Sequence, residues 1–319
     1  MNSPILIAGP TASGKSEIAL RLAERLGGEI ISADSMQVYR GLNVGTAKPT
    51  AAERARVPHH LVDICDLTES FDAAQFARLA KAAVAKIQAR GHVPILCGGT
   101  GLYFKAFLEG VGAAPPADPV LRGELERLPL ATLLAELLER DPVTHERIDR
   151  QNPRRVVRAV EVIRLTGKPF SQQRDAWDAA TGPRGTPNPR FIALLRSNSD
   201  LQHRINTRVD AMFRGGLVAE TEQLLKHGLA GNQTALQAIG YRQVVEYLGR
   251  PARTPAALAE TVELVKIRTR QFAKRQLTWF RRHGNPSWIE LKPGESLGDV
   301  AERLADQNLQ IRIRRLPVV

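Results

Sequence analysis

Gly9-Pro10-Thr11-Ala12-Ser13-Gly14-Lys15-Ser16 is the stretch of this sequence that decides its fold. It matches the pattern G-x-x-x-x-G-K-[ST], and it stands between a short apolar run at residues 4–8 and a helical pattern from Glu17 to Leu26. In this context the loop cradles phosphate, because successive backbone N–H groups and the helix N-terminus face one anion. Lys15 can lie along phosphate oxygens, and Ser16 can ligate Mg²⁺. We therefore expect the whole loop to bind a diphosphate or a triphosphate.

Four further apolar runs bounded by turn residues follow along the chain, at residues 29–33, 60–64, 93–97 and 190–196. Each run is too short for a helix and is typical of a buried strand. The segments between the runs have helical periodicity, most clearly from Asp72 to Arg90, where Asp72 and Gln75 form a predicted capping box. Alternating strands and helices predict an α/β fold, a P-loop NTPase-like parallel sheet of about five strands with flanking helices.

A helical segment separates the fourth and fifth predicted strands. It is entered through residues 115–119 and left through residues 182–189, which are both rich in proline. Such borders indicate a small all-helical domain inserted into the sheet domain. Within it, Asp141-Pro142 and Asn152-Pro153 each have the form of an N-cap followed by proline, which predicts two helix starts. We predict a catalytic core of residues 1–112 and 190–319 and an inserted domain of residues 113–189.

The composition, with 43% apolar and 24% charged residues in 319, is that of a folded globular protein and excludes low-complexity and wholly disordered classes. The only cysteines, Cys65 and Cys97, lie far apart in sequence, which excludes a disulfide scaffold and a thiolate zinc site. No apolar run approaches the roughly 18 residues of a membrane span. We therefore expect a cytoplasmic protein with no membrane partner.

Positive charge is concentrated in the last third of the chain. The net charge is +12, and residues 191–319 account for +8 of it, with 20 Lys and Arg against 12 Asp and Glu. A localised basic surface favours nucleic acid or another polyanion, although many basic proteins have no such partner. After the fifth strand we expect helices only, the longest from Thr254-Pro255 to about Arg282.

The end of that long helix is basic and aromatic. Residues 266–282 contain seven Lys and Arg and no acid. A charge run is usually a solvated helix face, but the missing acids favour phosphate contact with strong salt dependence. Phe272 and Trp279 lie on the apolar stripe of the helix, so we expect both in the core and not as base-stacking platforms.

Two motifs at the ends of predicted strands supply candidate chemistry. Asp34 follows the second strand, and Thr100 follows the fourth within Gly98-Gly99-Thr100-Gly101. Because the carboxyl ends of parallel strands face the ligand crevice, both should lie beside the phosphate loop. Asp34 can accept a proton or hold Mg²⁺ through water, and the alternative is that it only caps a turn. Thr100 can present a hydroxyl group to a ligand or cap a helix, and the glycines permit close approach of a ligand.

Taken in order, the motifs of this chain resemble the tRNA dimethylallyltransferases, also called tRNA isopentenyltransferases. The motifs are GPTASGKS at 9–16, DSMQVYR at 34–40, GGTGLY at 98–103, RRVVRAVEV at 154–162, QAIGYRQ at 237–243 and RQFAKRQLTWFRR at 270–282. The series extends over nearly the whole chain, whereas the P-loop alone is shared by many NTPases. The resemblance implies transfer of a dimethylallyl group from dimethylallyl diphosphate to the exocyclic amine of the adenine next to the anticodon, with release of diphosphate.

The resemblance also implies roles for individual residues. Asp34 would be the base that takes a proton from the adenine amine, and Thr100 would contact substrate at the reaction centre. The loop from Gly9 to Ser16 would hold the diphosphate leaving group and not ATP. Lys15, Ser16 with Mg²⁺, and Arg208 would stabilise the negative charge that develops on it.

The partner implied by the resemblance is a tRNA anticodon stem-loop, whose target base must be unstacked to reach a pocket. The implied contacts are Asp34, Ser35, Met36 and Gln37, then Arg154, Arg155, Val156, Val157 and Arg158, and finally Gln237, Ala238, Ile239, Gly240, Tyr241 and Arg242. The three arginines of the second group lie near a positive helix end, which is unfavourable unless an anion binds. Pairing with Asp149 or Glu161 is the alternative.

Two other functions use the same features. A small-molecule or nucleotide kinase would need the same loop, Mg²⁺ and an aspartate after the second strand, but it needs no extended cationic surface. An RNA-binding or GTPase-like regulatory module would need no prenyl chemistry. Since one stem-loop can fill one crevice, we expect a monomer.

Overall fold

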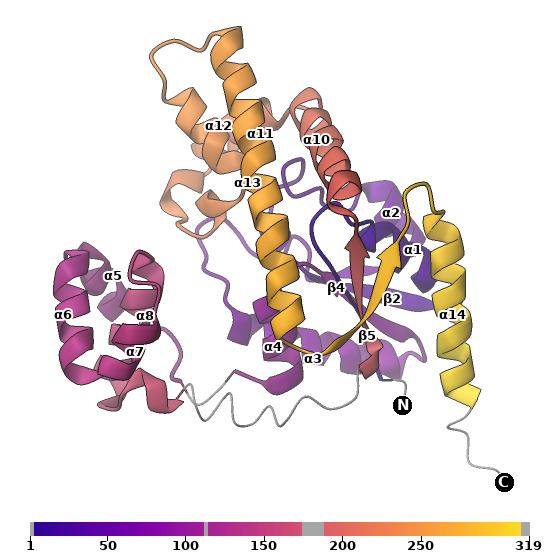
Figure 1. Cartoon of the computed structure of the whole chain (residues 1–319), viewed down its shortest axis with the longest axis horizontal. Coiled ribbons are helices and arrows are strands. Elements are labelled where there is room, and N and C mark those ends of the chain that lie inside the picture. The colour runs from indigo at the N-terminus through magenta and orange to yellow at the C-terminus, as the bar shows by residue number, and fades with distance from the viewer. Residues whose placement is uncertain (1–2, 112–113, 174–187, 314–319) are drawn as a thin grey trace. The chain divides into compact units, whose positions relative to one another are not determined.

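The computed structural model describes residues 3–111, 114–173 and 188–313, and its central feature is a six-stranded parallel sheet (Figure 1). The strand order is β3-β2-β4-β1-β5-β6. The strands are β1 (Ile5–Ala8), β2 (Gly28–Ala33), β3 (His59–His60), β4 (Val93–Gly98), β5 (Asn188–Arg196) and β6 (Pro286–Leu291). The predicted parallel α/β fold is therefore confirmed, with corrections to two strands.

The sixth strand corrects the expectation that only helices follow residue 196. β6 pairs in parallel with β5 at the edge of the sheet, where Ile192 is paired with Ser287 and Arg196 with Leu291. Its burial alternates instead of being continuous, so it has no uninterrupted apolar run. The expected strand at residues 60–64 is also corrected, because β3 contains only His59 and His60.

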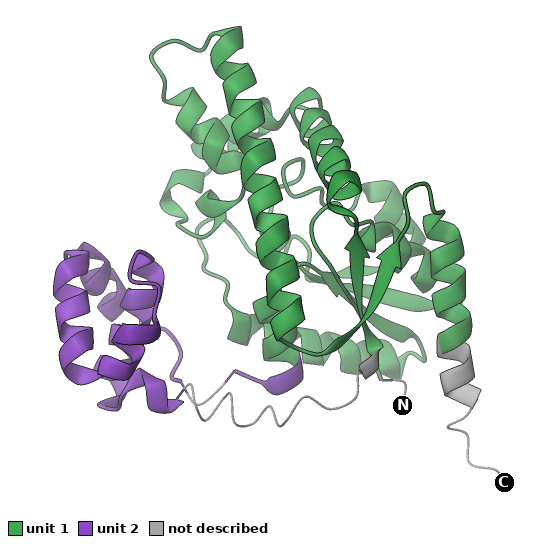
Figure 2. Cartoon of the chain, viewed as in Figure 1, with its two compact units in different colours: residues 1–107, 186–319 green, residues 108–185 purple. Residues whose placement is uncertain are grey.

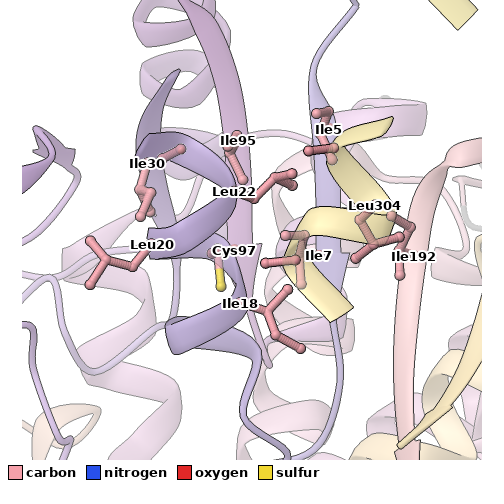
Figure 3. Close-up of a cluster of buried hydrophobic side chains, with 14 of the residues drawn as sticks. Ile5, Ile7, Ile18, Leu20, Leu22, Ile30, Ile95, Cys97, Ile192 and Leu304 are labelled. Carbon is pink, nitrogen blue, oxygen red and sulfur yellow. The ribbon is translucent and has the colours of Figure 1, made fainter. Parts of the chain in front are cut away.

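Side chains of the central strands point alternately to two apolar layers, as the period of a strand requires. On one face, Ile5 and Ile7 of β1 pack with residues of helices α1 (Lys15–Leu26) and α14 (Leu297–Ile313), as Figure 3 shows. On the other face, Leu6 and Ala8 pack with α3 (Ala73–Ala89) and α4 (Gly101–Glu109). Since both faces are covered, the sheet is buried, which is typical of parallel sheets.

A third apolar cluster lies among the helices that follow β5. The remaining helices there are α10 (Asn198–Arg214), α11 (Leu217–Lys226), α12 (Tyr241–Leu248) and α13 (Pro255–Arg282), and the short helix α2 (Ala51–Arg56) follows β2. Two 3₁₀ turns, η1 (Leu229–Gly231) and η2 (Ala235–Gln237), join α11 to α12. The segment after β2 packs into this cluster through Val38, Tyr39 and Leu42. The predicted bounds of α13 are confirmed, with Thr254 as the N-cap that accepts from the Ala257 N–H.

The chain divides into two compact units, which Figure 2 colours separately. Unit 1 comprises residues 1–107 and 186–319, and unit 2 comprises residues 108–185. Unit 2 includes the helices α5 (Pro119–Arg127), α6 (Leu130–Arg140), α7 (Pro142–Arg147) and α8 (Pro153–Thr166). Asp141 and Asn152 cap α7 and α8 with proline in the first turn, as predicted. The proline-rich exit predicted at residues 182–189 falls mostly outside the described residues.

Among the described helices, none combines the length and the apolar character that crossing a bilayer requires.

Candidate functional site

The phosphate loop joins β1, a central strand, to α1, and its backbone follows the glycine pattern of the sequence. Gly14 has φ 99° and Ala12 has φ 62°, so both occupy the left-handed region. Glycine enters this region without steric cost, whereas alanine is held there against its preference. The Lys15 Nζ donates to the Pro10 carbonyl at 3.2 Å, so the lysine side chain folds back over the loop. The loop therefore has the curled form that a phosphate cradle requires.

Two arginines fix the outer side of the loop. The Nε of Arg196, at the end of β5, donates to the Ser13 carbonyl at 2.7 Å, and the Nε of Arg204 in α10 donates to the Ala12 carbonyl at 2.9 Å. Arg196 is itself held by Asp200 at 2.6 Å. These bonds satisfy loop carbonyls, which keeps them turned away from an anion that the N–H groups would bind. Neither arginine was predicted as a site residue, although Arg196 is the last residue of a predicted strand and so lies at the same carboxyl edge of the sheet as Asp34.

Burial lowers the pKa values of two cations beside the phosphate loop, Lys15 and Arg208. For Lys15, burial is the largest cause of the lowered pKa, and the nearby Arg208 lowers the pKa further. Cys97 and Asp34 act in the opposite direction. Burial likewise lowers the pKa of Arg208, and Asp34 opposes the shift. Two half-buried cations next to one carboxylate leave an excess of positive charge, which a phosphate group would neutralise.

Asp34 and Thr100 lie close together at the carboxyl edge of the sheet, as expected from the ends of β2 and β4. The Thr100 Oγ1 accepts from the Ser35 N–H at 3.0 Å, and the Thr100 N–H donates to the Ala33 carbonyl at 3.2 Å. The Asp34 Oδ1 accepts from the Met36 N–H at 2.9 Å, so this carboxylate does cap its turn. Capping occupies one carboxylate oxygen, and the second can accept a proton.

The glycines on either side of Thr100 make room for two side chains of helix α13. A Cβ atom on Gly99 would lie 2.2 Å from the Gln276 Nε2, and one on Gly101 would lie 2.2 Å from the Trp279 ring. Gln276 also accepts from the Thr11 N–H at 2.9 Å and donates to the Gly99 carbonyl at 2.9 Å. One buried side chain of α13 thus ties the phosphate loop to the loop that carries Thr100. A polar residue at a core-facing position of α13 was the signal for it.

Two cavities meet at Arg208. The first has a volume of about 320 Å³, and it is lined by Asp34, Thr100 and apolar side chains such as Val209 and Met212. The second has a volume of about 530 Å³, and it is lined by phosphate-loop residues that include Lys15 and Ser16. Arg208 lines both cavities. The site therefore offers an anion compartment next to a partly apolar compartment that contains a carboxylate.

The predicted RNA-contacting segments divide into accessible and buried residues. Ser35, Met36, Gln237, Ala238 and Ile239 line the first cavity together with Asp34. The Gln37 amide is used within the chain, because its Oε1 accepts from the Ser32 hydroxyl at 2.8 Å and its Nε2 donates to the Thr46 carbonyl at 3.2 Å.

Tyr241 is fully buried in the third apolar cluster, next to Gly240, which is also buried. Arg242 is exposed and donates to Gln237 at 3.0 Å. The predicted contact by the Tyr241 side chain is corrected, since its ring is not on a surface.

The predicted RNA-contacting segment of unit 2, residues 154–158, contains both buried and exposed side chains. Val156 and Val157 are 0% and 4% exposed and pack in the apolar cluster of unit 2, so their side chains are not surface contacts. Arg158 pairs with Glu161 at 2.6 Å, which is the alternative that the sequence left open. Arg154 and Arg155 are exposed.

The basic face of α13 likewise contains both ion-paired and exposed cations. Lys266 pairs with Asp210 and Glu263, each at 2.8 Å, so part of its charge is compensated. Lys274, Arg275 and Arg281 are exposed. Phe272 is 36% exposed and lines the first cavity, which corrects its assignment to the core, whereas Trp279 is partly buried against the sheet.

Comparison with known proteins identifies relatives along nearly the full length. Residues 37–283 match the family model described as IPP transferase. The chain is 48% identical to the tRNA dimethylallyltransferase 1 of Trichlorobacter lovleyi, over 89% of this chain and 92% of that protein. It is 44% identical to the tRNA dimethylallyltransferase of Geobacter sulfurreducens, over 90% and 91% of the two chains.

Solved structures give the same result. The tRNA isopentenylpyrophosphate transferase from Bacillus halodurans superposes with a TM-score of 0.67 at 36% identity, covering 98% of this chain and all of that one. A eukaryotic dimethylallyltransferase, crystallised in snapshots of its action on tRNA, superposes with a TM-score of 0.74 at 27% identity. That comparison covers 98% of this chain and 78% of the eukaryotic one.

Proposed function

This chain belongs to the tRNA dimethylallyltransferase family, its activity is dimethylallyl transfer to a tRNA adenosine, and we propose that the acceptor is the exocyclic amine of the adenine next to the anticodon. The kinase alternative is thereby set aside. The observation that carries the proposal is the meeting of two cavities at Arg208, one lined by the phosphate loop and the other by Asp34. In this arrangement the diphosphate of the donor can lie in one compartment and the adenine in the other, with C1 of the prenyl group between them.

The diphosphate of dimethylallyl diphosphate occupies the compartment of Lys15, Ser16 and Arg208 in this proposal. When the bond between C1 of the prenyl group and the diphosphate oxygen breaks, negative charge grows on the leaving group. Fixed cations and backbone N–H groups stabilise that charge more in the transition state than in the ground state. The bracing of the loop by Arg196 and Arg204 supports this role, because preorganised donors need no rearrangement as the charge develops.

Mg²⁺ is the cofactor that this chemistry implies. The Ser16 side chain is exposed on the lining of the phosphate-loop cavity, which fits a metal held by one protein hydroxyl and otherwise by phosphate oxygens and water. When bound, the ion neutralises charge on the leaving diphosphate. We propose Ser16 as its protein ligand.

Asp34 takes the proton of the acceptor amine in this mechanism. The adenine nitrogen is a weak nucleophile because its lone pair is delocalised, so loss of a proton as the N–C bond forms lowers the barrier. The bond between N and C1 forms, the bond between C1 and oxygen breaks, and the proton moves to the free carboxylate oxygen of Asp34. Thr100 holds the Ser35 N–H beside this carboxylate and faces the same cavity, which supports a role in positioning substrate.

The tRNA approaches the first cavity in our proposal. Ser35, Met36, Gln237, Ala238 and Ile239 would surround the extruded base, and exposed Phe272 offers a ring face next to Arg275, whose guanidinium lies 5.9 Å from the ring centroid. Arg154 and Arg155 of unit 2 and the basic face of α13 would contact RNA phosphates. We propose a monomer acting on one anticodon stem-loop.

Product mapping tests this proposal. Purified protein is incubated with labelled dimethylallyl diphosphate, Mg²⁺ and unmodified tRNA, and the RNA is digested and analysed by mass spectrometry. We expect one prenylated adenosine next to the anticodon and one diphosphate released per transfer. A control tRNA with guanosine at that position should remain unlabelled. Label at another nucleoside, or in the guanosine control, would contradict the proposed acceptor.

A further inference from the structure

The loop of residues 43–48, which follows β2, forms a wall of both cavities. Gly45 and Thr46 line the first cavity, and Ala47 lines the second. Arg208, which also lines both, donates from its Nη2 to the Thr46 carbonyl at 3.3 Å. The position of this carbonyl therefore influences where the Arg208 guanidinium lies between the anion compartment and the acceptor compartment.

The loop 43–48 is held from outside by one carboxylate and one phenol. Glu220 of α11 accepts from the Asn43 N–H at 3.2 Å and from the Val44 N–H at 2.9 Å. The Tyr241 hydroxyl donates to Glu220 at 2.5 Å and accepts from the Gly45 N–H at 3.0 Å. Three successive backbone N–H groups are thus bound by two side chains that lie far away in the sequence.

Packing makes this attachment tight. Tyr241 is fully buried, and its ring lies so close to Gly45 that a Cβ atom there would be 2.4 Å from it. Burial and the hydrogen bond to Glu220 raise the pKa of Tyr241, so its hydroxyl remains a donor. The Tyr241 hydroxyl is the buried part of this network, so removing it leaves the Gly45 N–H without its acceptor and loosens the loop.

We propose that Glu220 and Tyr241 are positioning residues for the transfer reaction, acting on Arg208 through loop 43–48. The inference rests on the proposed role of Arg208 in holding the diphosphate. Neither side chain needs to touch substrate, because their effect passes through the Thr46 carbonyl. This gives the Tyr241 segment a different role from the RNA contact that its sequence implied.

A double-mutant cycle tests the inference. The single-turnover rate at saturating tRNA and dimethylallyl diphosphate is measured for the parent, Tyr241→Phe, Arg208→Ala and the double variant. Tyr241→Phe keeps the ring and removes only the hydroxyl, so the loop loses one anchor. We expect it to lower the rate about ten-fold in the parent and to have no further effect once Arg208 is absent, since residues that act through one another are not additive. The dissociation constant for tRNA should not change.

Tyr247→Phe is the matched control. Tyr247 lies on the same helix, α12, and in the same apolar cluster, but its hydroxyl donates to the Arg253 carbonyl at 3.4 Å and not to loop 43–48. We expect this variant to keep the parent rate. Glu220→Gln provides a second cycle with Arg208→Ala, because Glu220 is only half-buried and glutamine keeps its shape.

The outcomes separate this inference from the proposed function. Equal fold losses from Tyr241→Phe in the presence and absence of Arg208 would overturn the inference, since the effect would then not pass through the arginine. An equal loss in Tyr247→Phe would overturn it as well, because a general effect on α12 would explain the result. An undiminished rate in Arg208→Ala would instead refute the proposed role of Arg208.

Discussion

Strand β2 carries a glutamate near its start and is followed by an aspartate at its end, and the two carboxylates have opposite surroundings. Glu29 is 2% exposed and is bound by Arg90 at 2.7 Å, His60 at 2.6 Å and His92 at 2.7 Å. Although burial favours its neutral form, these bonds hold the pKa of Glu29 at about 2. Asp34 is half-buried, caps one turn with one oxygen, and lines a cavity.

The difference between the two ends of β2 indicates which carboxylate serves the fold and which serves the reaction. At the amino end of the strand, Arg90, His60 and His92 all bond to the carboxylate, which makes Glu29 a structural anchor for β3 and for the turn before β4. At the carboxyl end one backbone hydrogen bond leaves part of Asp34 available, next to Lys15 and Arg208, for which the described part of the chain has no ion pair. A carboxylate that is fully bonded stabilises the fold, and one that is partly bonded can take part in chemistry.

The largest effect should follow from Asp34→Asn. The amide cannot take a proton from the acceptor amine, but it can still cap the turn through its oxygen. We expect the single-turnover rate to fall by about 10²- to 10⁴-fold, with the melting temperature and tRNA affinity nearly unchanged. Stopped assays with labelled donor measure the rate, and filter binding measures the affinity. Undiminished turnover would remove Asp34 from the role of base and would erase the functional contrast with Glu29.

Glu29→Gln should do the opposite of Asp34→Asn: it should lower the stability of the fold and leave the transfer rate unchanged. A pKa lowered from 4.5 to about 2 corresponds to roughly 3 kcal/mol of folding free energy at neutral pH. Because the folded-state pKa is the lower one, this stability is fully present above about pH 5 and is lost as the pH falls through 4.5 toward 2. The variant should therefore be less stable than the parent at pH 7, and the gap should close in that acid window.

Urea unfolding of both proteins at several pH values between 3 and 7 measures this gap, within the range where each still folds. The transfer rate per folded molecule of Glu29→Gln should equal that of the parent, because Glu29 is at the other end of β2 from the site. A rate loss without a stability loss would reverse the roles assigned to the two carboxylates.

Local sequence signals predicted the parts of this comparison that depend on neighbouring residues. Continuous apolar runs located β1, β2, β4 and β5, and capping residues located the starts of α3, α7, α8 and α13. Because parallel strands end at one edge, the proximity of Asp34, Thr100 and the phosphate loop followed from the strand positions alone. Edge strand β6 was missed because its burial alternates and its sequence has no apolar run.

Contacts between distant segments were beyond the reach of the sequence. Gln276 bonds to Thr11 across 265 positions, and Glu220 bonds to Val44 across 176, so no local pattern connects them. The glycines at 99 and 101 announced a close neighbour, but the sequence could not decide between a ligand and helix α13. Tyr241 belonged to a motif of polar and aromatic residues, and only its burial separates a positioning role from an RNA contact.

A smaller effect is expected from Thr100→Val, which sharpens the description of the carboxyl edge. Valine keeps the shape but leaves the Ser35 N–H without the acceptor that it now has at 3.0 Å. An unsatisfied amide costs about 1 to 3 kcal/mol, and here the cost falls on the turn that carries Asp34. We expect the transfer rate to fall about ten-fold. Thr100→Ser keeps the hydroxyl group and should retain most of the rate, whereas equal losses in both variants would argue that the methyl group matters instead.

The smallest effect is expected for two lysines of α13, one with ion pairs and one, among the described residues, without. They repeat on a helix the contrast between the bonded Glu29 and the partly available Asp34. Lys266 of α13 is bound by Asp210 and Glu263, while Lys274 is exposed and, in the described part of the chain, has no ion pair. A lysine that contacts a phosphate releases one counterion, so its removal weakens binding modestly and lowers the salt slope by about 1. We expect this change in Lys274→Ala and not in Lys266→Ala when tRNA affinity is titrated against salt. Equal slopes in both variants would mean that internal pairing does not decide which cations of α13 meet RNA.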